Sequence, residues 1–225
     1  MRNIAVILAG GTGSRAGAGV PKQFRQLEDG RTSLEACVQA FAASRSISEI
    51  VVVMHPDHIA QAQQLLRDKA VTIIAGGSER WESSRNAIRH LAVREEEANI
   101  LLHDCARPFV SQRIIDDVCR ALEIHEAVTV AVPMTDTLYK VESLKWKVES
   151  IPPRNEYMRA QTPQAFRLSL IERAYRLALS DPDGVAATDD CGIVNKYIPE
   201  QPIYIVEGEE ANRKLTYASD FTCTL

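Results

Sequence analysis

Glycines and two cations follow the first apolar segment of the chain at a spacing suited to binding a polyphosphate. Residues 4–9 are a short apolar run, which predicts a buried parallel strand. The loop that follows contains, in order, Gly10, Gly11, Gly13, Arg15 and Lys22. Glycines let backbone amides approach a ligand closely, and successive amides form an anion-binding concavity. Because two positive charges accompany these amides, the segment is predicted to hold a polyphosphate.

The plainest alternative is a glycine-rich turn with two solvated cations. Two specific motifs are disfavoured, because the loop lacks the Gly-Lys-Ser/Thr ending of a P-loop and the third glycine of the dinucleotide-binding fingerprint. An NAD-binding oxidoreductase also predicts an acidic residue at the end of the second strand. Residues 49–54 are instead followed by His55 and Pro56, with Asp57 close by. That class would also leave the two cations of the loop unexplained.

A second segment with suitable chemistry is ILLHDCARPF, residues 100–109. Its predicted strand ends in His103 and Asp104, which places a carboxylate at the binding edge. Mg²⁺ prefers one or two carboxylates together with phosphate oxygens, so Asp104 is the predicted metal ligand, with helix capping as the alternative role. Arg107 is expected to orient Asp104 through an ion pair. His103 is expected to be structural, because transfer to a phosphate needs no base.

A third segment is GGSERWESS, residues 76–84. Two glycines after a strand, then Ser and Glu before a helix, are compatible with a plain turn that caps the helix. Taken alone, this segment does not distinguish a turn from a ligand-binding loop.

Strands and helices alternate along most of the chain. Apolar and β-branched runs predict strands at residues 49–54, 71–75, 100–103, 128–132 and 203–206. Helices are predicted at residues 33–43, 57–69 (with Asp57 as N-cap), 81–94, 111–124 and 168–179, with a short helix near 188–197. This alternation is typical of a parallel sheet covered on both faces by helices, which binds ligands at the carboxyl ends of its strands. We therefore expect the chemistry at one edge of the sheet.

Residues 135–153 break the alternation and are predicted to form a β-hairpin. Apolar residues alternate there with charged ones, at Leu138, Val141, Trp146, Val148 and Ile151. A protruding hairpin that exposes such side chains would need cover, which a second subunit could supply. A hairpin folded back on its own domain is the alternative.

Composition and charge limit the classes of protein to which this chain can belong. The 225 residues are 45% hydrophobic and 25% charged, as in ordinary globular proteins. A net charge of -4 argues against a nucleic-acid surface, although not against a local basic pocket. Five cysteines without C-x-x-C spacing favour reduced thiols over a zinc site or disulfides. The first predicted strand leaves no room for a signal peptide, and no apolar run approaches the ~20 residues that cross a bilayer. A cytoplasmic protein without membrane contact is therefore expected.

The stretch LAGGTGSRAGAGVPKQF, residues 8–24, resembles the signature of the cytidylyltransferases that make CDP-activated sugar alcohols. The similarity continues in GG-x-x-R-x-x-S at 76–83, HDCARP at 103–108, QTPQAF at 161–166, TDD at 188–190 and N-x-K-L-T at 212–216, and so covers nearly the whole chain. The resemblance implies an α/β fold of the nucleotide-diphospho-sugar transferase type. That fold is a single domain over 1–225 with a Rossmann-like, mostly parallel sheet flanked by helices and a protruding β-hairpin arm.

The resemblance also implies Mg²⁺-dependent transfer of CMP from CTP to a sugar-alcohol phosphate, with release of pyrophosphate. The residues that stabilise the transition state in this family match Arg15, Lys22 and Lys214. Those that bind the nucleotide match Ala9, Gly10, Gly11, Gly13, Gly77, Arg80, Ser83 and Asp104. Those that bind the acceptor match Thr137, Arg154, Thr162 and Thr188. Residues 135–153 match the arm that interlocks two subunits, which implies a homodimer with Thr137 and Arg154 reaching the neighbouring site.

Two acceptors fit the resemblance. HDCARP and PMTDT look more like the enzymes that use 2-C-methyl-D-erythritol 4-phosphate for isoprenoid synthesis, and this acceptor is favoured. Gly10 and the IPPRNEY segment at 151–157 look more like the enzymes that use D-ribitol 5-phosphate for cell-wall or capsule synthesis. A non-catalytic nucleotide-binding protein on the same scaffold would predict the loss of Lys22, Asp104 or Lys214, and all three are present.

Overall fold

The computed structural model describes residues 1–11, 20–94, 96–142, 145–182, 185 and 187–221. Gly13 and Arg15 of the predicted phosphate loop lie outside the described residues. Within the part of the chain that is described, none of the helices combines the length and apolar composition needed to cross a bilayer.

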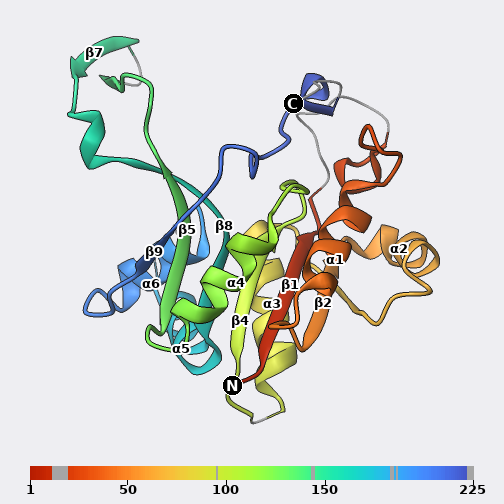
Figure 1. Ribbon diagram of the computed structural model, residues 1–225. Helices are drawn as coiled ribbons and strands as arrows, with labels where there is room; N and C mark the ends of the chain where they lie inside the picture. The colour runs from red at the N-terminus through yellow and green to blue at the C-terminus, as the bar shows by residue number, and fades with distance from the viewer. Residues whose placement is uncertain (12–19, 95, 143–144, 183–184, 186, 222–225) are drawn as a thin grey trace.

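A seven-stranded sheet forms the centre of the molecule, in the order β3-β2-β1-β4-β8-β5-β9 (Figure 1). Its strands are β1 (Asn3–Ala9), β2 (Glu49–Met54), β3 (Thr72–Ala75), β4 (Asn99–Asp104), β5 (Ala127–Pro133), β8 (Met158–Arg167) and β9 (Tyr204–Glu207). Strand β8 runs antiparallel to β4 and β5, and the other neighbouring strands pair in parallel. The predicted mostly parallel α/β sheet is confirmed.

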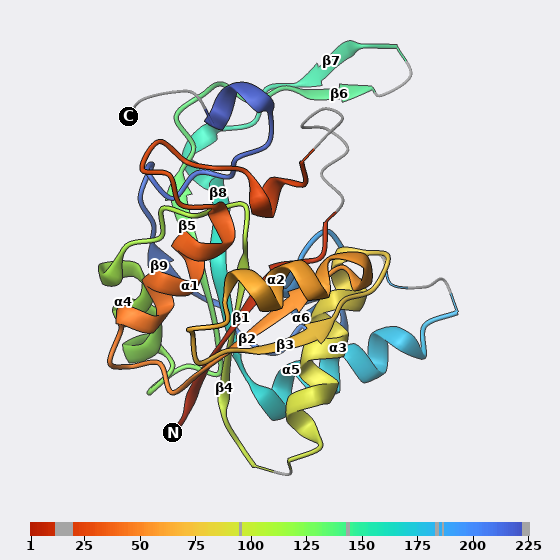
Figure 2. The same cartoon turned by 90° about the vertical axis from the view of Figure 1, so that its right-hand side faces the viewer.

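Helices cover both faces of this sheet (Figure 2). Helices α1 (Ser33–Ala43), α2 (Ile59–Leu65) and α4 (Gln112–Ala121) contribute to one core, and α3 (Arg80–Ala92), α5 (Leu168–Leu179) and α6 (Asp190–Tyr197) contribute to the other. Because side chains alternate along a strand, β1 supplies Ala5, Ile7 and Ala9 to the first core and Ile4, Val6 and Leu8 to the second. An unbroken apolar run is therefore what a strand buried on both faces requires.

Strand β8 was not predicted from the sequence. Its central residues include Gln161, Thr162, Pro163 and Gln164, a polar run with a proline that lacks the apolar, β-branched character of the other strands. The polar side chains instead hold neighbouring segments in place. Gln161 Nε2 donates to the carbonyl oxygen of Glu209 at 2.8 Å, and Gln164 Nε2 donates to Asp189 Oδ2 at 2.7 Å.

The predicted helix at residues 57–69 is shorter than expected. A 3₁₀ turn, η3 (Pro56–His58), precedes α2, which ends at Leu65. Asp57 does not cap the helix, because it lies inside η3 and the N-cap position of α2 is His58, which makes no side-chain cap bond. The chain must turn after Leu65 so that β3 can pair with β2.

The predicted hairpin is confirmed and forms a separate two-stranded antiparallel sheet, β6 (Lys140–Glu142) and β7 (Lys147–Ser150). It protrudes from the end of the molecule at which β1 and β4 terminate (Figures 1 and 2). All residues of both strands are exposed, and Trp146 beside them is 89% exposed. The hairpin therefore makes no core with the central sheet.

Candidate functional site

A cavity of about 360 Å³ opens at the carboxyl ends of β1 and β4. Nine of the residues proposed from the sequence line it, namely Ala9, Gly10, Gly11, Lys22, Gly77, Arg80, Ser83, Asp104 and Lys214. The sequence did not single out its other lining residues, Leu8, Gln23, Ser78, Glu79, Cys105 and Ala106. Segments from opposite ends of the chain therefore meet around one space, as expected for a parallel sheet that binds ligands beyond its strand ends.

Asp104 is the acidic centre of this cavity. Its Oδ1 accepts a hydrogen bond from Arg80 Nε at 3.0 Å, and its Oδ2 accepts one from Lys214 Nζ at 2.7 Å. Burial acts to raise the pKa of Asp104, but these two cations outweigh it and hold the pKa well below the usual range of a carboxyl group. Asp104 is therefore ionised at neutral pH, although its side chain is only 12% exposed.

Lys214 reaches the cavity from a segment near the end of the described chain. The buried Asn212 fixes this segment by donating from Nδ2 to the carbonyl oxygen of Thr162 at 2.9 Å. The backbone amide of Leu215 donates to the carbonyl oxygen of Ala106 at 2.8 Å, and the Leu215 side chain is buried. Lys214, between these two anchors, is held with its ammonium group over Asp104.

Lys22 begins the 3₁₀ turn η2 (Lys22–Phe24) on the other side of the cavity. Its Nζ lies 3.5 Å from the carbonyl oxygen of Leu215, which brings the glycine loop and the C-terminal segment together. Three cations, Lys22, Arg80 and Lys214, therefore line the cavity, an arrangement suited to binding a polyanion.

The loop after β3 turns sharply in front of α3. Glu82 Oε2 accepts hydrogen bonds from the amide and hydroxyl of Ser78, and its side chain folds back over Gly77. A Cβ at Gly77 would lie 2.2 Å from the Glu82 Cβ, so only glycine fits. Ser83 Oγ accepts from the amide of Gly77 at 3.2 Å and donates to the carbonyl oxygen of Glu79 at 3.3 Å. The capping arrangement considered from the sequence therefore also shapes the cavity wall.

His103 lies in the interior beneath Asp104. Its Nε2 is 3.0 Å from the carbonyl oxygen of Arg107, which can only accept, so Nε2 carries the proton. The Thr162 hydroxyl then donates to Nδ1 at 3.0 Å and accepts from the backbone amide of Asp104 at 3.1 Å. Burial lowers the pKa of His103 to about 4, so the ring is neutral at physiological pH. These contacts give His103 the structural role expected for it.

The expectation that Arg107 forms an ion pair with Asp104 was wrong. Its guanidinium group donates to two carbonyl oxygens, from Nη1 to Asn212 at 2.7 Å and from Nη2 to Ala160 at 3.1 Å. Arg80 and Lys214 pair with Asp104 instead. Arg107 faces the backbone of β8 and of the C-terminal segment, because these two segments pack beside the end of β4.

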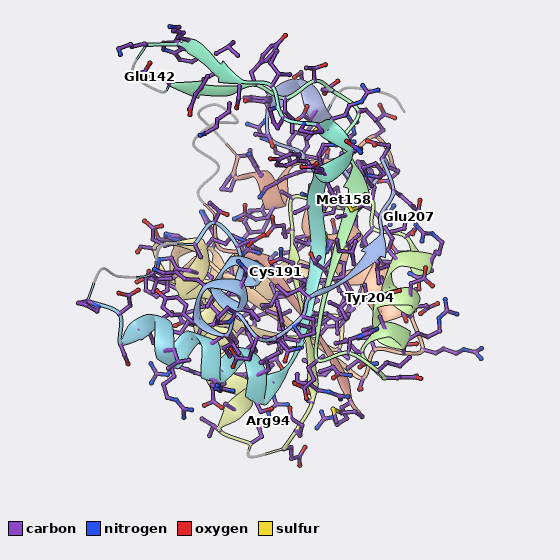
Figure 3. The ribbon with its side chains drawn as sticks, turned by 90° about the vertical axis from the view of Figure 1, so that its left-hand side faces the viewer. Arg94, Glu142, Met158, Cys191, Tyr204 and Glu207 are labelled. Atoms are coloured by element: carbon purple, nitrogen blue, oxygen red, sulfur yellow. The ribbon has the colours of Figure 1, made fainter. Side chains whose placement is uncertain are left out.

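The four residues assigned to the acceptor do not line this cavity in the described chain. Thr137 and Arg154 are exposed at the base of the arm, where Arg154 Nη1 donates to the carbonyl oxygen of Thr135 at 2.8 Å. Thr162 is buried beneath Asp104, and Thr188 is exposed just before α6. Figure 3 shows the arm, marked by Glu142, standing well away from Cys191 on α6. The acceptor-binding roles of these residues stay predictions.

Sequence reasoning gave no role to Asp190 and Tyr175, which lie directly behind the cavity. Asp190 is wholly buried and pairs with Arg80, and the Tyr175 hydroxyl donates to Asp190 Oδ1 at 2.6 Å. Asp190 is the last residue of the TDD run noted in the sequence, and this acidic doublet was the signal available. Nothing local to Tyr175, in the middle of α5, distinguishes it from a core aromatic residue.

A sequence model of the 2-C-methyl-D-erythritol 4-phosphate cytidylyltransferase (IspD) family matches residues 3–224. The chain belongs to this family. It is therefore a cytidylyltransferase, an enzyme of the nucleotidyltransferase class.

Two curated relatives and one solved structure illustrate the match. The chain is 44% identical to a protein of Thermobifida fusca named 2-C-methyl-D-erythritol 4-phosphate cytidylyltransferase, over 97% of this chain and 90% of that one. It is 38% identical to the bifunctional ribulose 5-phosphate reductase/CDP-ribitol pyrophosphorylase Bcs1 of Haemophilus influenzae, over 97% of this chain and 46% of that protein. The crystal structure of 4-diphosphocytidyl-2C-methyl-D-erythritol synthase from Anaerococcus prevotii superposes with a TM-score of 0.83 at 27% identity, covering 98% of this chain and 95% of that chain.

Proposed function

We propose that this cytidylyltransferase transfers CMP from CTP to 2-C-methyl-D-erythritol 4-phosphate, giving the CDP-alcohol and pyrophosphate. The observation that carries the proposal is the cavity at the carboxyl edge of the sheet, which Lys22 lines and in which Arg80 and Lys214 pair with Asp104. The names of the relatives support this choice of nucleotide and acceptor.

The reaction needs positioning and charge neutralisation rather than covalent help from the protein. A phosphate oxygen of the acceptor attacks the α-phosphorus of CTP, and the bond from that phosphorus to the pyrophosphate oxygen breaks. Negative charge moves onto the leaving pyrophosphate. Lys22 and Lys214 are suited to stabilise that charge, because both ammonium groups border the cavity, and Arg15 is assigned to the same task by the sequence resemblance.

Asp104 fits the role of Mg²⁺ ligand. Mg²⁺ binds through one or two carboxylates plus phosphate oxygens, and Asp104 is ionised with two oxygens at the cavity wall. In the described part of the chain no cluster of three or more metal-binding side chains exists, so the phosphates of CTP would supply the other ligands. A bound Mg²⁺ would supply charge stabilisation on the phosphate oxygens.

We further propose that the acceptor half of the site is completed by a second copy of the chain. The arm, residues 135–153, exposes Trp146 and Ile151 to solvent in the single chain, at 89% and 61%. Apolar side chains gathered on a protruding hairpin are typical of an interaction surface. In a homodimer, Thr137 and Arg154 at the base of the arm would approach the partner's cavity and bind the acceptor phosphate, for which the planar guanidinium group is suited.

D-ribitol 5-phosphate is a second candidate acceptor, favoured by the 38% identity to Bcs1 over 97% of this chain. Pyrophosphate release with Mg²⁺ and CTP, measured with each acceptor in parallel, distinguishes the two. UTP and ATP serve as nucleotide controls. We expect release with CTP and 2-C-methyl-D-erythritol 4-phosphate. Release with ribitol 5-phosphate alone would change the acceptor, and the absence of CTP binding would overturn the proposed function.

A further inference from the structure

A buried carboxylate lies behind the cavity wall, outside the set of residues assigned to substrates. Asp190, the first residue of α6, is 0% exposed. Its Oδ2 accepts a hydrogen bond from Arg80 Nη1 at 2.7 Å, and its Oδ1 accepts one from the Tyr175 hydroxyl at 2.6 Å. Burying a charge is unfavourable unless it is paired and hydrogen-bonded. Both oxygens of Asp190 meet that condition, and one of the partners is a residue of the cavity.

The position of Asp190 is fixed by β8. Gln164 Oε1 accepts hydrogen bonds from the backbone amides of Asp190 at 3.0 Å and Cys191 at 3.3 Å. Gln164 Nε2 donates to Asp189 Oδ2, and Asp189 Oδ1 accepts from the amide of Gly192 at 2.7 Å as the N-cap of α6. The start of α6 is therefore fixed to β8, whose Thr162 also holds the backbone amide of Asp104. Strand β8 therefore helps to fix the positions of both carboxylates that contact Arg80.

Arg80 bridges these two carboxylates. Its Nε donates to Asp104 in the cavity, and its Nη1 donates to Asp190 behind it. Burial acts to lower the pKa of Arg80, but the charges of Asp190 and Asp104 outweigh it, so the pKa lies above its usual value. Because the guanidinium group is flat and rigid, two contacts on different nitrogens define its rotation as well as its place.

We propose that Asp190 is a positioning residue of the cytidylyltransferase site, which acts by holding Arg80 against Asp104. Tyr175 supports it by binding the second oxygen. Without the charge at Asp190, Arg80 keeps only its contact with Asp104, and its guanidinium group can turn toward the triphosphate. The Asp104 carboxylate then loses its fixed orientation at the nucleotide half of the site. This inference rests on the proposed function for its kinetic readout.

The test is an Asp190→Asn variant, which keeps the size of the side chain and one acceptor oxygen, removes its charge and replaces the other oxygen by an NH2 donor. We expect kcat/KM for CTP to fall about 10- to 100-fold, the range typical when a residue that orients a ligand-binding group is removed. The KM for the acceptor should stay at its wild-type value. An equal change in both KM values would overturn the proposal, because it would indicate a general structural defect.

A double-mutant cycle with Arg80→Ala tests whether Asp190 acts through Arg80. If it does, Asp190→Asn/Arg80→Ala should be no slower than Arg80→Ala alone. Fully multiplicative losses would overturn the proposal.

Tyr175→Phe is the second variant, should Asp190→Asn fail to fold, and we expect a smaller loss in the same direction from it. Loss of the effect of Tyr175→Phe in the Arg80→Ala background supports the proposal, and persistence of that effect overturns it.

Tyr197→Phe is the matched control. Tyr197 lies on α6, and its hydroxyl donates to an aspartate, Asp181, at 2.7 Å. Asp181 pairs with Lys196, which does not line the cavity, whereas Asp190 pairs with the cavity residue Arg80. The Tyr197→Phe variant should keep wild-type kinetics, and a loss equal to that of Tyr175→Phe would overturn the proposal.

If the wild-type protein binds CTP but releases pyrophosphate with neither acceptor, the proposed function fails. The dissociation constant for CTP then replaces kcat/KM in every comparison, with the same outcomes for Asp190.

Discussion

The cavity and the arm are built in opposite ways. Around the cavity, Asp104 and Asp190 are buried and Arg80 joins them, so that β4, α3, α6 and the C-terminal segment are cross-linked by charge-assisted hydrogen bonds. On the arm, both strands are exposed on all residues, and the salt bridge between Lys140 and Glu149 lies in solvent. Exposed ion pairs of this kind contribute little to stability.

In the proposed function, the cavity binds the nucleotide and the arm binds the acceptor phosphate. At the cavity, Asp104 is paired with Arg80 and Lys214 within one chain. The arm has no core of its own and carries Arg154 outside the cavity. It gains a defined environment only by contact with another surface, and the proposed dimer would provide one.

The largest effect should come from the cavity. We expect Lys22→Ala to lower kcat by about 10²- to 10³-fold, because it removes a preorganised cation from the developing charge. Pyrophosphate release measures the loss, and circular dichroism checks that the fold is intact. Lys69→Ala, at an exposed lysine beyond α2, is the matched control. Near-normal turnover of a folded Lys22→Ala variant would remove Lys22 from the transition state.

The buried His103 beneath the cavity should make the free energy of unfolding depend on pH. The pKa of His103 is lowered by burial to about 4 in the folded chain, against 6.5 for an exposed imidazole in the unfolded chain. Between these values the unfolded chain therefore binds one proton more than the folded chain. The stabilising contribution of neutral His103 is therefore present above pH 6.5 and is lost as the pH falls from 6.5 to 4. The loss should be about 3 kcal/mol in the free energy of unfolding.

Urea unfolding at pH 7, 6, 5 and 4 measures this slope. His103→Gln should lack that part of the slope, whatever its stability at pH 7. His90→Gln, altered on the partly exposed surface of α3, is the matched control. Equal slopes for wild type and His103→Gln would show that the ring is not held neutral beneath Asp104.

The arm should respond in substrate binding rather than in turnover. We expect Arg154→Ala to raise the KM for the acceptor about 10- to 100-fold, the equivalent of one or two hydrogen bonds to a charged group, with the KM for CTP unchanged. Lys147→Ala, at another exposed arm cation, is the control. A rise of both KM values by the same factor would place Arg154 outside the acceptor site and weaken the division between cavity and arm.

The smallest effect should be on assembly. We expect Ile151→Ala to raise the dissociation constant of the dimer about tenfold, since it removes an apolar side chain that the partner would bury. Sedimentation over a range of concentrations measures this constant. Ile124→Ala removes an isoleucine that is 81% exposed beyond α4 and should leave assembly unchanged. A wild-type chain that stays monomeric throughout would refute the role given to the arm.

Much of the fold was predictable because its signals are local. Strand β2 and helices α1 and α5 begin and end at the predicted residues, since β-branched runs and 3.6-residue spacing act over a few neighbouring positions. Strand β8 was missed because its polar residues serve contacts with other segments. Its role depends on what packs beside it, which no local pattern records.

Several residues that line the cavity could be named from the sequence alone. Lys22, Asp104 and Lys214 lie in recognisable motifs, and all three line the cavity. Which charged side chains pair could not be predicted from the sequence. Arg80 lies 24 positions from Asp104 and 110 from Asp190, whereas Arg107 is three residues from Asp104 and turns to the backbone instead. Pairing depends on the direction of each side chain and the charges packed against it, and these are fixed only when distant segments fold together.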